Sequence, residues 1–150
     1  MVKKLDENSP ANGPDHIGVR LWTAWEAWKA DFVSAMNEAG HSWFTPSRAT
    51  LLGFVPRKGA RQSDLIVRMG VSKQAVQQLI DGLEEEGVLE RMPDPADKRG
   101  RIVRHTASGR AALDDADRIK GEIEARYRER MGEERFRLLF EMLGEVRRGN

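Results

Sequence analysis

Polar side chains that can read DNA gather at the start of one predicted helix. They are Lys73, Gln74, Gln77 and Gln78. Gln can form two hydrogen bonds with the edge of adenine, and Lys can donate to guanine or to a phosphate. A helix face that is merely solvated more often carries Glu and Lys pairs. The residue types therefore favour contact with the major groove of double-stranded DNA, and a solvated helix face is the alternative.

A basic cluster follows at the tip of a predicted hairpin. Its cations are Lys98, Arg99 and Arg101, three within four residues. They would repel one another unless a polyanion such as the DNA backbone were present. Asp97 lies two residues from Arg99, and we expect its carboxylate to hold that guanidinium by a bidentate contact. The alternative is an edge hairpin kept soluble by its charge.

The elements that must position these side chains are a helix, a tight turn and a second helix. Gly70 suits a left-handed turn conformation, and Ser72 is a strong N-cap for the helix that follows. We expect Val71 to anchor the turn in the core. Apolar residues then recur at three- and four-residue intervals, which gives the second helix one buried face. They are Ala75, Val76, Leu79, Ile80 and Leu83.

A two-stranded hairpin is predicted after the second helix. Gly87 ends that helix, and residues 88–92 and 102–105 have strand character. Residues 93–97 form a turn-rich loop between them, and Thr106 caps the next helix. A helix-turn-helix presents its second helix to the major groove, and the basic hairpin supplies charge for phosphates beside it.

This segment resembles the winged helix-turn-helix of the MarR family, the multiple-antibiotic-resistance regulators. Within the wing signature of the family, Gly100 stands at the small-residue position that is usually Ala or Ser, and His105 stands at the position that is usually Leu. The resemblance covers residues from about 17 to 146. The wing signature, Asp-x-Arg before a small residue, a base and a Val-x-Leu-Thr strand, is matched by Asp97, Arg99, Gly100, Arg101, Val103 and Thr106.

The helix-turn-helix itself resembles the family's pattern, with one departure. Arg61 stands where many relatives have a Thr that caps the first helix, so that cap is in doubt and Arg61 becomes a candidate phosphate contact. Residue types and resemblance together predict a set of DNA-binding residues, with Asp97 orienting the wing. The set is Arg61, Gln62, Ser72, Lys73, Gln74, Gln77, Gln78, Lys98, Arg99 and Arg101.

Both ends of the chain are predicted to be helices whose apolar faces need a partner. The resemblance implies that these terminal helices interlock in a homodimer. The expected fold is mainly α with a small β-hairpin wing: a winged helix-turn-helix plus N- and C-terminal dimerisation helices. We expect residues 1–16 to be a flexible tail and 17–150 a single domain, with 45–106 as the winged helix-turn-helix and 17–40 plus 107–148 as the dimerisation helices.

The predicted function is that of a sequence-specific transcriptional regulator, a repressor by resemblance. Two-fold symmetry implies a pseudo-palindromic operator with half-sites on the order of 34–36 Å apart. The alternative is a winged helix that only binds proteins. Such a module would tend to lose the wing cations and the polar helix face, and this chain keeps both.

Composition argues for one small non-enzymatic domain without cofactor or metal. The chain has 150 residues, no Cys and three scattered His, at 16, 41 and 105. Disulfide scaffolds, thiol sensors and metal-ligand spacing are therefore excluded, and no nucleophilic triad or nucleotide loop is visible. A net charge of +1 means that any DNA-binding surface is local. We expect Arg57 to belong to that surface, and the acids Asp114, Asp115 and Asp117 to face solvent.

No targeting or membrane segment is visible in the sequence. Lys3 and Lys4 are followed by acidic and polar residues where a signal peptide would be apolar. The longest apolar patch, residues 51–55, is far too short to cross a bilayer. We therefore expect a cytoplasmic protein.

A small-molecule effector is a further expectation from the resemblance. Relatives often bind aromatic or phenolic acids between the dimer helices and the winged domain. Ordinary packing is the alternative role for the aromatic and charged residues that could line such a crevice. They are Trp22, Trp25, His41, Trp43, Phe44 and Arg48.

Overall fold

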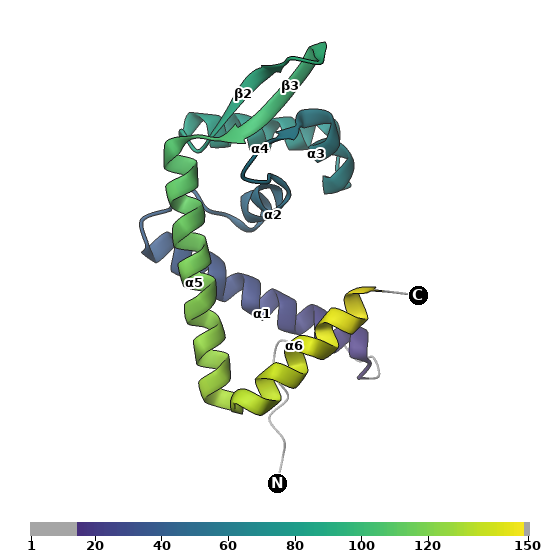
Figure 1. The fold of residues 1–150 in the computed structure, drawn as a ribbon, viewed down its shortest axis with the longest axis vertical. Helices are drawn as coiled ribbons and strands as arrows, with labels where there is room; N and C mark the ends of the chain where they lie inside the picture. The colour runs from purple at the N-terminus through teal and green to yellow at the C-terminus, as the bar shows by residue number, and fades with distance from the viewer. Residues whose placement is uncertain (1–14, 149–150) are drawn as a thin grey trace.

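Three long helices at the two ends of the chain frame the structure, a computed structural model that describes residues 15–148 (Figure 1). They are α1 (Ile17–Glu38), α5 (Ala107–Met131) and α6 (Glu133–Arg148). α5 runs along the long axis of the molecule, α1 crosses it, and α6 turns back from its far end. The turn occurs at Gly132, whose φ of 85° suits a residue without a side chain.

The remaining elements form a compact unit at one end of α5, which we call the reading head. The helices of this unit are α2 (Pro46–Phe54), α3 (Gln62–Met69) and α4 (Lys73–Glu85). The strands are β1 (Ala60–Arg61), β2 (Leu89–Asp94) and β3 (Asp97–His105), in the antiparallel order β1-β3-β2. The predicted mainly α fold with a hairpin wing is confirmed. The short strand β1 was not predicted, because two residues are too few to show an alternating pattern.

The predicted tail of residues 1–16 lies almost wholly outside the described residues. At its end, Asp15 pairs with Arg20, and His16 is the N-cap of α1 without a side-chain hydrogen bond. Within residues 15–148, none of the helices combines the length and the apolarity needed to cross a membrane.

Local signals around the helix-turn-helix were predicted correctly, with one error. Gly70 has a left-handed φ of 64°, and the Ser72 hydroxyl accepts the Ala75 N–H at 3.1 Å. The Thr106 hydroxyl accepts the Gly109 N–H at 3.0 Å at the start of α5. The prediction that Val71 enters the core is wrong: it is 50% exposed. The turn runs along the surface, and the buried face of α4 begins later, at Val76.

The wing, which is the hairpin of β2 and β3, differs from the predicted one in its strand ends. β3 begins at Asp97 rather than at residue 102, and the turn is only Pro95 and Ala96. Pro93 pairs with Arg101, but the next pair is Asp94 with Asp97, so residues 98–100 have no partners across the hairpin. A β-bulge of this kind bends the strand and exposes the extra residues. The predicted loop of residues 93–97 was therefore too long.

One continuous core joins the reading head to the long helices. α4 contributes Val76, Ile80 and Leu83, the predicted inward face, and Ala75 and Leu79 lie half-buried at its edge. The other side chains of this core cluster come from α1, α2, α3, α5, the wing strands and the adjoining loops. They include Phe32, Met36, Leu51, Leu65, Val88, Leu89, Val103, Ile119 and Ile123. Phe136 of α6 is buried outside the cluster.

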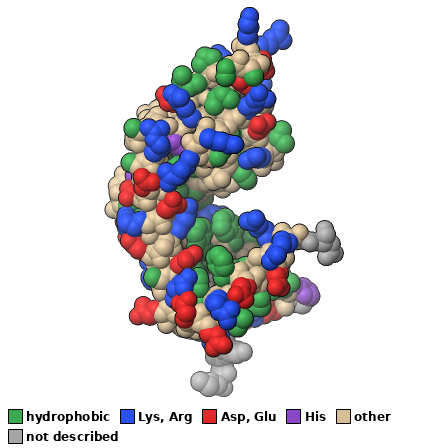
Figure 2. Space-filling view, viewed as in Figure 1, with side chains coloured by type: hydrophobic (Ala, Val, Ile, Leu, Met, Phe, Trp, Pro, Cys, Tyr) green, Lys and Arg blue, Asp and Glu red, His purple; other side chains and the backbone are tan. Residues whose placement is uncertain are grey.

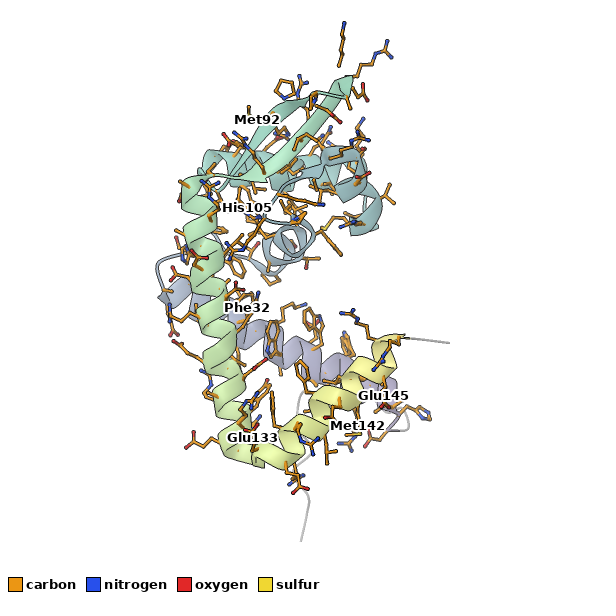
Figure 3. All side chains as sticks on the ribbon, in the orientation of Figure 1. Phe32, Met92, His105, Glu133, Met142 and Glu145 are labelled. Carbon is orange, nitrogen blue, oxygen red and sulfur yellow. The ribbon has the colours of Figure 1, made fainter. Side chains whose placement is uncertain are left out.

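His105 is a polar side chain inside this core, at the end of β3 (Figure 3). It is 1% exposed, and its Nε2 lies 3.0 Å from the Val55 carbonyl oxygen. A carbonyl only accepts, so Nε2 carries the proton, and Nδ1 is buried without a partner. Burial lowers the pKa of His105, and the nearby charges of Arg57 and Arg110 lower the pKa further. The ring is therefore neutral in the folded protein at pH 7.

We expect His105 to make stability depend on pH below about 6.5, the ordinary His pKa. Above that pH, neither the folded nor the unfolded state binds the proton, and the stabilisation is complete. As the pH falls, only the unfolded chain takes up the proton, and the free energy of unfolding decreases. Urea unfolding at pH 7.5 and 5.5 should show a loss in the wild type and a smaller loss in His105→Leu. Equal losses would contradict the assignment.

Candidate nucleic-acid interface

The first turn of α4 presents the predicted polar face on the surface. Lys73, Gln74 and Gln78 are exposed, and Gln77 is half-buried. The Ser72 hydroxyl is occupied by capping, although its side chain remains exposed. A helix start with these donors and acceptors can hydrogen-bond to base edges and phosphates.

The wing adds exposed cations beyond the body of the protein (Figure 2). Lys98, Arg99 and Arg101 are all exposed, and none has an ion pair with any of residues 15–148. The expected bidentate contact between Asp97 and the Arg99 guanidinium is wrong. The bulge turns the chain back on itself, and the Asp97 carboxylate accepts the Arg99 backbone N–H at 2.9 Å instead.

A half-buried arginine joins α3, α4 and the wing. The Arg91 Nε donates to the Gln62 side-chain oxygen at 2.8 Å, and its Nη2 lies 2.7 Å from Asp81. The guanidinium also pairs with Glu84, and a Glu84 oxygen accepts the Arg91 backbone N–H at 2.8 Å. Gln62 therefore has only its amide group left for DNA. Sequence reasoning placed Arg91 in a strand and missed this role.

Arg61 lies between the sheet and α3. It pairs with Ile102 in the sheet and occupies the N-cap position of α3. Its side chain makes no capping hydrogen bond, as expected from an Arg at a position where relatives have Thr. Its Nε lies 2.9 Å from the Oδ2 of Asp94. Sequence reasoning treated Asp94 only as a turn residue.

The acids of α5 include Asp114 and Asp117, which are exposed as expected but also pair with Arg57, and Asp115, which is half-buried. Arg57 lies 2.9 Å from Asp114 and 3.3 Å from Asp117, and His41 lies 2.8 Å from Asp115. The hydrogen bond from His41 lowers the pKa of Asp115, and the Asp114 carboxylate raises the pKa of Arg57. Arg57 is thus directed to α5 and is not part of the free basic surface.

A cavity of about 530 Å³ lies between α1, α2 and the first half of α5. Figure 2 shows the hollow between the reading head and the lower helices, with hydrophobic side chains on its surface. Of the six residues predicted for a ligand pocket, Trp25, Trp43 and Phe44 line it. The other three lie elsewhere. Trp22 is exposed on α1, His41 pairs with Asp115, and Arg48 donates to the Trp43 carbonyl oxygen at 2.9 Å.

Large apolar side chains remain exposed on α1 and α6. Figure 3 shows Met142 on α6, the helix that turns back from the end of α5. Phe136, at the start of α6, is covered by the Arg128 guanidinium 4.3 Å from its ring centre. The other large apolar side chains of α1 and α6, which we call the apolar stripe, remain exposed among residues 15–148. The exposed residues are Ile17, Trp22, Trp25, Leu138, Phe140, Met142, Leu143 and Val146.

Comparison with known proteins agrees with this geometry. Residues 44–100 match a family model described as MarR family. Wild-type apo MarR from E. coli is 19% identical, with a TM-score of 0.75, and the match covers 90% of this chain and 98% of that chain. RV1404 from Mycobacterium tuberculosis is 19% identical, with a TM-score of 0.74 and coverage of 94% and 99%. Transcriptional regulator Tm0710 from Thermotoga maritima is 24% identical, with a TM-score of 0.62 and coverage of 85% and 89%. No curated protein sequence matches the chain.

Proposed function

We propose that this chain is a sequence-specific DNA-binding regulator of transcription of the MarR family, whose model matches residues 44–100. One observation carries the proposal: the exposed polar start of α4 lies in the same reading head as Lys98, Arg99 and Arg101 of the wing, which have no ion pair with residues 15–148. A net charge of only +1 makes this concentration of free positive charge distinctive. The family fold favours this function over a winged helix that only binds proteins.

The proposed contacts fall into two groups. Gln74, Gln77 and Gln78 read base edges in the major groove, since the N-terminal part of the second helix reaches the bases in such motifs. The remaining contacts position the protein on the backbone, and Asp97 holds the wing backbone without touching DNA. They are Arg61, the Gln62 amide, Ser72, Lys73, Lys98, Arg99 and Arg101.

A selected operator, enriched from random duplexes, tests the base contacts. Replacing Gln74 or Gln77 with Ala should cost about 1–3 kcal/mol on the operator and much less on random DNA. Glu85→Ala, on an exposed residue at the far end of α4, is the matched control and should change neither affinity. Equal losses on both DNAs would show that the glutamines touch only the backbone. A wild type without salt-dependent DNA binding would refute the function itself.

We infer that the protein is a homodimer through its terminal helices. The support is the exposed apolar stripe on α1 and α6, which costs free energy in water. Two reading heads related by two-fold symmetry would fit a pseudo-palindromic operator, and occupancy of a promoter by such a dimer would make it a repressor.

Light scattering should report about twice the chain mass of 17.0 kDa. The double variant Phe140→Glu and Leu143→Glu should be monomeric, because two buried carboxylates would have no partners. Its operator affinity should fall as well. Arg135→Glu adds the same charge at an exposed position of α6 and should remain a dimer. A monomeric wild type that binds the operator tightly would contradict the proposal.

We further propose that the cavity takes a small aromatic acid as effector. Its surface is mainly aromatic and aliphatic, and Lys29, Arg57 and Lys120 are cations at its edge that would exchange their present partners, Glu26, Asp114 and Asp117, for the carboxylate of the effector. A phenolic carboxylate such as 4-hydroxybenzoate should quench tryptophan fluorescence saturably and release the DNA. Ala112→Phe, which projects a ring into the cavity, should abolish both effects if the variant still folds. Quenching that does not saturate would remove the effector from the proposal.

A further inference from the structure

We propose that Asp94 is a positioning residue for DNA binding: its buried carboxylate holds Arg61 and the wing tip as one unit. In that arrangement, Arg61 presents its terminal amino groups to a backbone phosphate beside the wing. The inference rests on the proposed DNA-binding function and assigns a role to a residue that has no contact with DNA itself.

The Asp94 carboxylate is fully used within the protein. Its side chain is 4% exposed. One oxygen accepts the Ala96 backbone N–H at 2.9 Å and so shapes the two-residue turn of the wing. The other oxygen lies 2.9 Å from the Arg61 Nε. A buried carboxylate is tolerated only when it is paired and hydrogen-bonded, so both contacts are needed to keep it there.

The backbone of Arg61 is fixed by neighbouring elements, whereas the end of its side chain is exposed. Its backbone is fixed twice, by pairing with Ile102 in the sheet and by its place at the start of α3. Its Nε is the guanidinium nitrogen nearest to the Asp94 carboxylate, and the side chain is 52% exposed. The two terminal nitrogens have no other ion pair among residues 15–148. A guanidinium paired with a carboxylate on its Nε side can present its two terminal nitrogens as a planar pair of donors that matches a phosphate.

Gly100 makes room for this carboxylate. A Cβ at Gly100 would lie 3.0 Å from the Asp94 Cβ and 3.2 Å from its Oδ2, closer than ordinary van der Waals contact. The two departures from the family pattern, Arg61 for Thr and Gly100 for Ala or Ser, therefore meet at the same side chain. Asp94 accounts for both departures, because Arg61 supplies the cation that pairs with its carboxylate and Gly100 leaves space for that carboxylate.

For Asp94→Asn, the proposed positioning role and a role of net charge alone predict opposite changes in DNA affinity. Removal of a negative charge near DNA should tighten binding if only net charge matters. We expect weaker binding instead, roughly tenfold, which is the scale of one lost hydrogen bond to a charged group. The slope of log affinity against log salt should also become shallower by about 0.9, which corresponds to one lost phosphate contact. A purely structural role would lower the unfolding temperature but leave the slope of the folded protein unchanged.

Two further variants keep the charges constant. Arg61→Lys retains the cation but has no planar guanidinium that can pair with Asp94 and still present two donors to a phosphate, so it should lose affinity and slope as Asp94→Asn does. Gly100→Ala alters no charge and presses on the Asp94 carboxylate, so it should produce the same loss. Adding Gly100→Ala to Asp94→Asn should cause little further loss, because both act on one contact. Asp64→Asn is the control: it removes an exposed acid of α3 that has no ion pair among the described residues, and it should bind at least as tightly as the wild type.

DNA binding by the wild type distinguishes failure of the proposed function from failure of this inference alone. If it does not bind duplex DNA at low salt, the proposed function fails and this inference fails with it. If it binds, but Asp94→Asn behaves like Asp64→Asn at an unchanged unfolding temperature, only the positioning role is overturned. If Asp94→Asn does not fold, Arg61→Lys and Gly100→Ala decide: wild-type affinity and slope in both would overturn the role.

Discussion

The close packing of α5 against the start of β2 determines how the reading head sits on the long helices. A Cβ at Gly109 would lie only 2.0 Å from the Val88 carbonyl oxygen, so no other residue fits there without movement of the backbone. Thr106 adds a hydrogen bond from its hydroxyl to the Gly87 carbonyl oxygen at 2.6 Å. Because β3 leads directly into α5, this junction fixes the orientation of α5 relative to the wing in the structure.

Ion pairing sorts the basic residues into structural and available ones. Arg57 pairs with acids of α5 and so holds the reading head to α5. Arg91 of the wing contacts Asp81 of α4 and Gln62 of α3 and so joins these two helices to the wing. Lys98 and Arg99, in the bulge of the wing, have no such partner within residues 15–148. A chain that is nearly neutral overall thereby keeps a local positive surface, which is the electrostatic requirement for approach to a phosphate backbone.

The cavity and the exposed apolar stripe share α1. Trp25 stacks on Trp28 with ring centres 5.4 Å apart, lines the cavity, and is still half exposed. Any partner that covers α1 would therefore also close part of the cavity. A molecule bound in the cavity would in turn contact α5 and also α2, which is part of the reading head. The proposed dimer contact and the proposed effector site therefore share Trp25 of α1, and the cavity also borders α5.

The sequence by itself determined the helix-turn-helix and its polar face. Gly70, Ser72 and Thr106 act on backbone groups only a few residues away, and the apolar period of α4 defines its buried side without reference to the rest of the chain. The tertiary structure alone decided the partners of the charged residues. Arg57 meets Asp114 across 57 residues of sequence, and Arg61 meets Asp94 only because the sheet brings α3 to the wing. Hydrogen bonds within a turn are encoded by neighbouring residues, whereas an ion pair between distant segments exists only after packing has placed its two side chains within reach.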